Sequence, residues 1–142
     1  MPNLLVIDDD QETLDILKME LTRAGYRVLL ALNWEEVVDQ IRRAHDARWA
    51  IDAIILDLMM PVRSGFDVLQ SLQVMLDPMP PVVVLSALSG IPDQIKAREM
   101  GADKYLVKPT SRKHLINALE EVLSQGRRST WRDIRSKWRK DE

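Results

Sequence analysis

Five short apolar runs alternate with five amphipathic segments, and this alternation limits the possible folds more than any other feature of the chain. The apolar runs span residues 4–7, 26–32, 53–56, 81–86 and 104–109. Apolar residues recur at helical spacing within residues 14–24, 33–41, 65–75, 92–100 and 115–123. Runs that are apolar throughout are typical of strands covered on both faces, and strand–helix alternation implies a parallel sheet. The sequence therefore predicts a three-layer α/β fold.

Turn and cap residues mark the ends of several predicted helices. Gly25 and Gly101 follow two of them, in the position where glycine commonly ends a helix. Asn33 is suited to cap the second helix, and Pro92 falls in the first turn of the fourth. The second strand is less apolar than the others, so we expect it near an edge of the sheet. The seven methionines are expected to fill the core.

The composition is that of one globular domain. The chain has 142 residues, of which 46% are hydrophobic, and a net charge of -2, which gives no general attraction to nucleic acid or acidic membranes. The absence of cysteine excludes disulfides and thiolate metal sites. The N-terminus lacks the cationic region of a secretory signal, and no apolar run is long enough to span a bilayer. We therefore expect a soluble, cytoplasmic protein without a membrane span.

Polar side chains of complementary type follow four of the predicted strands. They are Asp8 and Asp9 after the first, Asp57 after the third, Ser86 at the end of the fourth and Lys108 after the fifth. Because the carboxyl ends of parallel strands meet at one edge of the sheet, we expect these groups to converge. Three carboxylates would repel one another without a cation, and Mg²⁺ prefers oxygen ligands. The set fits phosphoryl transfer, in which an aspartate can be the nucleophile.

Plainer interpretations exist for single residues of this set. Asp57 could cap a turn, and the acids after the first strand could serve the dipole of the next helix, Asp10 more readily than Asp8 or Asp9. Ser86 could be an ordinary hydroxyl at a strand end. The combination of acidic, hydroxyl and basic groups at matching strand ends favours the functional interpretation.

Four motifs in order resemble those of the response-regulator receiver domain of two-component signalling. They are Asp8-Asp9, the segment 57–61 with Gly65, Ser86-Ala87, and the segment 101–109. Each motif is weak alone, but all four at matching spacing are specific. The resemblance implies a doubly wound, flavodoxin-like fold with strand order 2-1-3-4-5 and five flanking helices. It places a receiver domain at residues 1–125.

The resemblance also implies the roles of the acidic residues. Asp57 would accept a phosphoryl group from the phosphohistidine of a histidine kinase or a phosphotransfer protein. Mg²⁺ would be held by Asp8, Asp9, Asp57 and the backbone carbonyl of Met59. The protein would be a signalling receiver that catalyses only its own phosphorylation and dephosphorylation, not an enzyme with a separate substrate.

Three further residues would read the phosphoryl group. Lys108 would pair with its oxygens, and the Lys108-Pro109 bond is expected to be cis. Ser86 would hydrogen-bond to it, and the rotamer of Tyr105 would report that movement, unless Tyr105 is only a half-buried strand aromatic. The surface of the fourth helix, fifth strand and fifth helix would then repack. It would control a partner, a homodimer or a fused effector; the motifs name neither kinase nor effector.

Two apolar residues depart from what a rapidly hydrolysed acyl phosphate requires. In the family, the positions two residues after the phosphoacceptor and two after the switch hydroxyl flank the attacking water. Here they are Met59 and Leu88. We expect these side chains to crowd out water or fail to orient it, so that the aspartyl phosphate is long-lived.

Two alternatives compete with the receiver hypothesis. A haloacid-dehalogenase-type phosphatase would use Asp8 and Asp10, which stand at i and i+2 after the first strand. That hypothesis gives Asp57 and Met60-Pro61 no role, and the chain leaves little room for a substrate cap. A receiver-like module that never accepts phosphate is the other, and the complete residue set argues against it.

Residues 126–142 form a basic, tryptophan-containing tail. From 127 to 140 there are seven basic residues and one acid, and Trp131, Ile134 and Trp138 would share one helical face. The tail could extend the last helix, begin a linker to an effector domain, or bind acidic partners or a membrane; we favour the first two. It is too short for a DNA-binding domain, so we expect no direct nucleic-acid binding. A chain that is complete at Glu142 would be a single-domain regulator acting through protein contacts.

Overall fold

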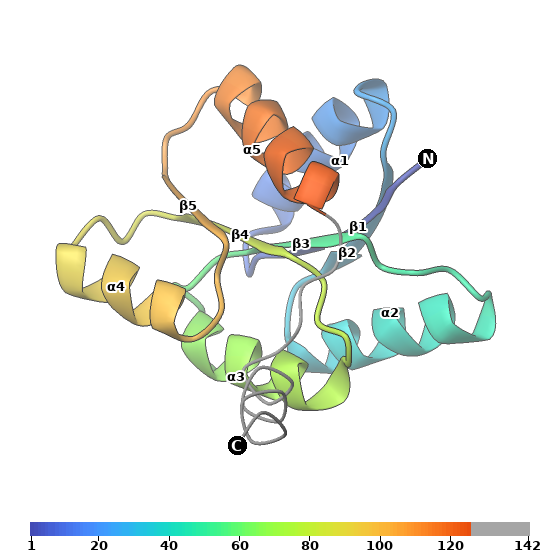
Figure 1. The fold of residues 1–142 in the computed structure, drawn as a ribbon, viewed down its shortest axis with the longest axis horizontal. Helices are drawn as coiled ribbons and strands as arrows, with labels where there is room; N and C mark the ends of the chain where they lie inside the picture. Colours follow the sequence, from blue (N-terminus) through green and yellow to red (C-terminus); the bar gives the residue numbers. More distant parts are fainter. Residues whose placement is uncertain (126–142) are drawn as a thin grey trace, which may run out of the picture.

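The computed structural model describes residues 1–125, which form the predicted three-layer α/β fold (Figure 1). All neighbouring strands are parallel, in the order β2-β1-β3-β4-β5, which confirms the predicted topology and the edge position of β2. The strands are β1 (Asn3–Ile7), β2 (Arg27–Ala31), β3 (Ala53–Leu56), β4 (Val82–Ser86) and β5 (Lys104–Val107). The helices are α1 (Gln11–Arg23), α2 (Trp34–Asp46), α3 (Gly65–Met75), α4 (Ile91–Glu99) and α5 (Arg112–Gln125).

The sheet separates two apolar cores. Helices α1 and α5 cover one face, and α2, α3 and α4 cover the other (Figure 1). Successive residues of β1 alternate between them: Leu4 and Val6 pack on the α1/α5 side, and Leu5 and Ile7 on the other. Every residue of β1, β3 and β4 is buried. The continuous apolar runs of the sequence are therefore explained by helices on both faces.

The predicted helix ends are confirmed by their local geometry. Asn33 caps α2, because its side-chain oxygen accepts a hydrogen bond of 2.9 Å from the backbone N–H of Glu36. Pro92 lies in the first turn of α4. Gly25 and Gly101 have φ angles of 98° and 104°, the left-handed conformation that favours glycine after a helix.

The expectation that the methionines fill the core is wrong for most of them. Met79 is buried, and Met60 and Met100 pack at the edge of the core. The other four are exposed: Met1, Met19, Met59 and Met75. Met19 and Met75 lie on solvent-facing positions of α1 and α3, and Met1 and Met59 lie outside the helices and strands.

Two further expectations concern a membrane span and the C-terminal tail. Within residues 1–125, no helix is both long and apolar enough to cross a membrane. The proposed tail, residues 126–142, lies outside the described residues, so its three interpretations stay predictions.

The first residue of α3, Gly65, packs closely against the backbone that follows β3. The N–H of Gly65 donates a 3.0 Å hydrogen bond to the carbonyl of Leu58. A Cβ atom at Gly65 would lie 2.3 Å from the carbonyl oxygen of Asp57 and 2.4 Å from the Cα atom of Leu58. Any side chain at this position would therefore displace the backbone that holds Asp57.

The substitution Gly65→Ser should lower the free energy of unfolding by about 1–3 kcal/mol, the usual cost of overpacking, because the added atoms meet backbone. Urea unfolding followed by circular dichroism measures the change. Gly90→Ser is the matched control: a Cβ there would lie 3.4 Å from the side chain of Asp93, an ordinary contact distance, and serine is a good residue at this N-cap. Equal losses in the two variants would contradict the close-approach argument.

Candidate functional site

Backbone hydrogen bonds between strand ends bring the predicted polar residues to one edge of the sheet. The N–H of Asp8 donates to the carbonyl of Ala31 at 3.1 Å, and that of Asp57 to the carbonyl of Ile7 at 3.0 Å. The N–H of Lys108 donates to the carbonyl of Ser86 at 2.8 Å. Parallel pairing thus continues one step past the strands. The residues just beyond β1, β3 and β5 are held at neighbouring positions.

Three carboxylates gather at this edge. Asp8 and Asp57 are 3% and 6% exposed, whereas Asp9 is exposed. One oxygen from each lies within 4.8 Å of the others, and within residues 1–125 this is the one such group of acidic or histidine side chains that could hold a metal ion. All the side-chain donors are hard carboxylate oxygens, which suits Mg²⁺ better than a softer metal.

Lys108 reaches into the acidic cluster from the end of β5. Its Nζ lies 2.7 Å from Oδ2 of Asp8 and 3.0 Å from Oδ2 of Asp57. The Lys108-Pro109 bond is cis, as predicted from the resemblance. The cluster thus holds one ammonium and three carboxylates, and the ammonium contacts the two that are buried. The imbalance leaves negative charge that a divalent cation would neutralise, so the donor set fits such an ion.

The electrostatics of the pair follow from burial and from these contacts. Burial raises the pKa of Asp8 above its ordinary value, and the hydrogen bonds from Lys108 and from the backbone of Asp10 offset only part of this effect. Burial alone would lower the pKa of Lys108. The hydrogen bonds and charges of Asp8 and Asp57 outweigh it, so the pKa of Lys108 is raised and the ammonium stays charged at neutral pH.

Two backbone N–H groups orient the buried carboxylates. The N–H of Met59 donates to Oδ1 of Asp57, and that of Asp10 donates to Oδ1 of Asp8, both at 2.9 Å. Each buried carboxylate therefore has one oxygen held by backbone and the other by Lys108. The predicted metal contact of the Met59 carbonyl stays a prediction; its side chain is half exposed at this edge.

Asp10 belongs to the helix and not to the cluster. Its Oδ2 accepts a 2.6 Å hydrogen bond from the hydroxyl of Thr13 in the first turn of α1. That hydrogen bond is the main reason why the pKa of Asp10 is lowered. The plainer interpretation of Asp10 therefore fits the structure. The phosphatase alternative lacks its second carboxylate at the site.

Ser86 and Tyr105 meet through the backbone of Leu88. Ser86 is fully buried, and its Oγ accepts a 3.3 Å hydrogen bond from the N–H of Leu88. The hydroxyl of Tyr105 donates a 2.7 Å hydrogen bond to the carbonyl of Leu88. Burial is the main cause of the raised pKa of Tyr105, followed by the charges of Asp93 and Asp57. The carbonyl of Leu88 was missed by sequence reasoning, because a backbone group has no signature in the sequence.

Comparison with known proteins agrees with this geometry. The sequence model of the family described as "Response regulator receiver domain" matches residues 4–120. The chain is 39% identical over 120 residues to a probable transcriptional regulator, ycf27, of Porphyridium aerugineum, covering 84% of this chain and 47% of the relative. It is 34% identical over 131 residues to the transcriptional regulatory protein CpxR of Escherichia coli K12, covering 92% and 52%. The chain thus spans about half the length of these relatives.

Solved structures show the same likeness. The receiver domain of the Francisella response regulator 1452 superposes with a TM-score of 0.76 at 29% identity, covering 88% of this chain and 98% of that one. The family match, the strand order and the acidic cluster at the carboxyl edge of the sheet agree with one another. This chain belongs to the response-regulator receiver domains of two-component signal transduction.

Proposed function

We propose that this receiver is a phosphorylation-dependent switch whose phosphoacceptor is Asp57 and whose phosphodonor is a histidine kinase or a phosphotransfer protein. The observation that carries the proposal is the contact of Lys108 with Asp8 and Asp57 in a buried acidic cluster. The cluster would bring together Asp57 as the nucleophile, Asp8 and Asp9 as further metal ligands, and Lys108 as the cation that binds the phosphoryl group. The catalysis involved is the receiver's own phosphorylation and dephosphorylation, in the cytoplasm.

The chemistry assigned to each residue follows from its position. A carboxylate oxygen of Asp57 attacks the phosphorus of the donor phosphohistidine. An acyl phosphate O–P bond forms while the N–P bond breaks, and the imidazole leaves with the electron pair. Lys108 pairs with a phosphoryl oxygen and the Ser86 hydroxyl donates to another.

The metal would be Mg²⁺, held by Asp8, Asp9, Asp57 and the carbonyl of Met59. When bound, the ion supplies positive charge that neutralises the carboxylates and the incoming phosphoryl oxygens. Asp8 and Asp57 are already oriented by backbone N–H groups, and one carboxylate oxygen of the exposed Asp9 already lies within 4.8 Å of an oxygen of each. The chain therefore needs little rearrangement to form the site.

The switch would run through Leu88. When Ser86 turns its hydroxyl toward the phosphoryl group, it gives up the hydrogen bond from the N–H of Leu88. The carbonyl of the same residue holds Tyr105, so the loop after β4 and the Tyr105 rotamer would change together. Phosphorylation of this kind acts through a local charge and a two-state element.

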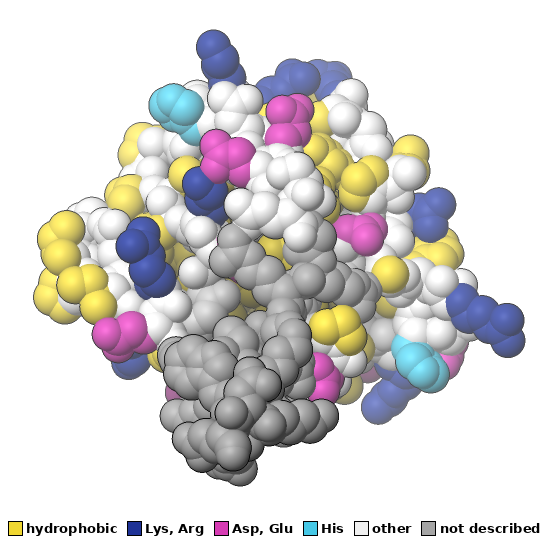
Figure 2. Space-filling view, in the orientation of Figure 1, with side chains coloured by type: hydrophobic (Ala, Val, Ile, Leu, Met, Phe, Trp, Pro, Cys, Tyr) yellow, Lys and Arg dark blue, Asp and Glu magenta, His cyan; other side chains and the backbone are white. Residues whose placement is uncertain are grey.

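The output surface would be that of α4, β5 and α5. Ile91 and Ile95 are 64% and 53% exposed, one turn apart on α4. Hydrophobic side chains gather over α4 at the left of the molecule (Figure 2). We propose that this face binds a second copy or a downstream effector. The chain itself would not contact nucleic acid, although the relatives ycf27 and CpxR are named as transcriptional regulators.

The first prediction from the proposed function concerns the nucleophile. Labelling with radioactive acetyl phosphate and Mg²⁺ should be abolished in Asp57→Ala, because no acyl phosphate can form. It should be weakened but not abolished in Asp8→Ala, which acts through the metal. A covalent label that survives Asp57→Ala, or one lost only in Asp8→Ala, would contradict the assignment and support the phosphatase alternative.

The second prediction concerns the metal. Asp9→Asn should raise the Mg²⁺ concentration for half-maximal phosphorylation about tenfold, a cost of about 1.4 kcal/mol, with the fold intact because Asp9 is exposed. Excess EDTA should abolish labelling in both proteins. Asp10→Asn is the control, since Asp10 bonds to Thr13 outside the cluster and should leave the Mg²⁺ dependence unchanged. Equal shifts in the two variants would count against the metal site.

The third prediction concerns the lifetime of the phosphoryl group. Met59→Asn/Leu88→Glu should speed dephosphorylation about tenfold, equivalent to about 1.4 kcal/mol of barrier, because polar side chains can orient the attacking water. A time course of label loss after removal of the donor measures the rate. Equal rates in the wild type and the double variant would rule the idea out.

A further inference from the structure

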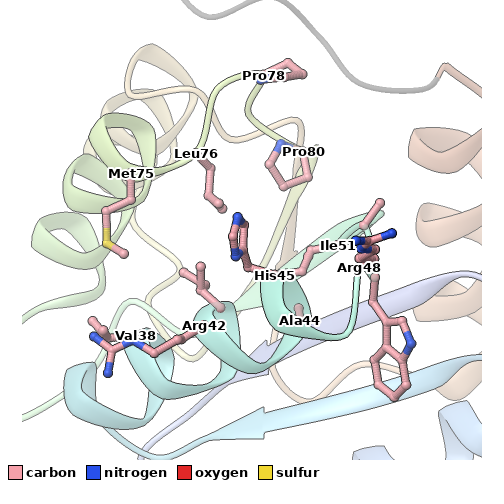
Figure 3. A pocket seen from close by; sticks show the side chains of 13 residues that line it. Val38, Arg42, Ala44, His45, Arg48, Ile51, Met75, Leu76, Pro78 and Pro80 are labelled. Carbon is pink, nitrogen blue, oxygen red and sulfur yellow. The ribbon is translucent and has the colours of Figure 1, made fainter.

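An apolar groove lies at the end of the sheet where the strands begin, opposite the end that carries Asp57. It is formed by the C-terminal ends of α2 and α3, the loop before β3 and the connector before β4 (Figure 3). The groove has a volume of about 680 Å³, within the range of about 300–1,000 Å³ typical of ligand sites. None of the proposed phosphorylation residues lines it.

The floor of the groove is apolar. Ala44 and Ile51 are buried, Leu76 is partly buried, and Pro80 is buried in the connector. The ring of His45 points from α2 toward Leu76 and Pro80 (Figure 3). The groove therefore offers an apolar surface for an apolar side chain, with polar groups around it.

The ionisable side chains that line the groove are all basic: Arg42, His45 and Arg48. His45 has a carboxylate neighbour, Asp46, at 3.6 Å. Within residues 1–125, neither Arg42 nor Arg48 has a carboxylate within 4.0 Å. Both guanidinium groups are therefore available to a carboxylate from outside, with which they can form paired hydrogen bonds.

The turn that carries Arg48 is well defined. Arg48 has a φ of 59°, a conformation that glycine usually takes after a helix, and its N–H donates to the carbonyl of His45 at 3.1 Å. The next residue, Trp49, donates to the carbonyl of Ala44 at 2.8 Å and lies under the guanidinium of Arg27 at 4.0 Å. Arg48, on the basic side of the groove, thus belongs to a hydrogen-bonded turn.

We propose that this groove is a docking site for an acidic segment of a partner protein, which inserts an apolar side chain between α2 and α3. Charge complementarity to Arg42 and Arg48 selects the acidic segment. The chain's own tail has the wrong charge to bind Arg42 and Arg48, because residues 127–140 hold seven basic residues and one acid. Docking at this edge would leave the proposed phosphorylation site open, and it does not depend on phosphorylation of Asp57.

The test titrates the full ¹⁵N-labelled chain with a short synthetic peptide that has leucine and phenylalanine at helical spacing among glutamates and aspartates. Saturable amide shifts are expected at the ends of α2 and α3. Arg42→Glu/Arg48→Glu should weaken binding about tenfold, as expected from the loss of two exposed ion pairs. Arg42→Glu alone should weaken binding less. This single variant tests the proposal if the substitution at Arg48 disturbs the turn.

Arg43→Glu is the matched control, since Arg43 is exposed on the same helix but does not line the groove. It should leave the affinity unchanged, and a basic peptide with the same apolar residues should bind the double variant better than the wild type. Equal weakening in all variants, or shifts outside the groove, would overturn the proposal. So would groove signals that change on removal of residues 127–142, which would make the tail the occupant.

Discussion

The contact of one ammonium group with two buried carboxylates is the interaction on which the site depends. Lys108 lies 100 residues from Asp8 and 51 from Asp57 in the sequence, yet its Nζ is within 3.0 Å of an oxygen of each. This geometry requires β1, β3, β4 and β5 to be neighbours in one parallel sheet. The cluster remains short of positive charge, and that shortage is what a divalent cation would supply.

The surroundings of the cluster are rigid on one side and adjustable on the other. On the β3 side, Gly65 brings α3 so close that a Cβ would collide with the backbone of Asp57. On the β4 side, the backbone of Leu88 links Ser86 to Tyr105 through one hydrogen bond to each side chain. Under the proposed function, a fixed Asp57 beside an exchangeable hydrogen-bond chain would be suited to convert a new charge into a movement at α4 and β5.

The two edges of the sheet offer different kinds of contact. The carboxyl edge holds the acidic cluster, and the opposite edge holds an apolar groove lined by Arg42, His45 and Arg48. Opposite charges at opposite ends would allow a phosphodonor and an acidic partner to approach without competing for one surface. The proposed output face over α4 would then be a third contact region.

The sequence by itself determined the strands, their order in the chain and the polar residues that follow them. Hydrophobic periodicity and strand ends are local properties, so the sequence alone assigns Asp8, Asp57 and Lys108 to one edge of the sheet. Only the tertiary structure decided that Asp10 turns away to Thr13 and that the Leu88 carbonyl links Ser86 to Tyr105. Backbone groups carry no side-chain signal, and side-chain directions depend on how each helix is rotated against the sheet. The exposed methionines and the groove between α2 and α3 could not be predicted for the same reason.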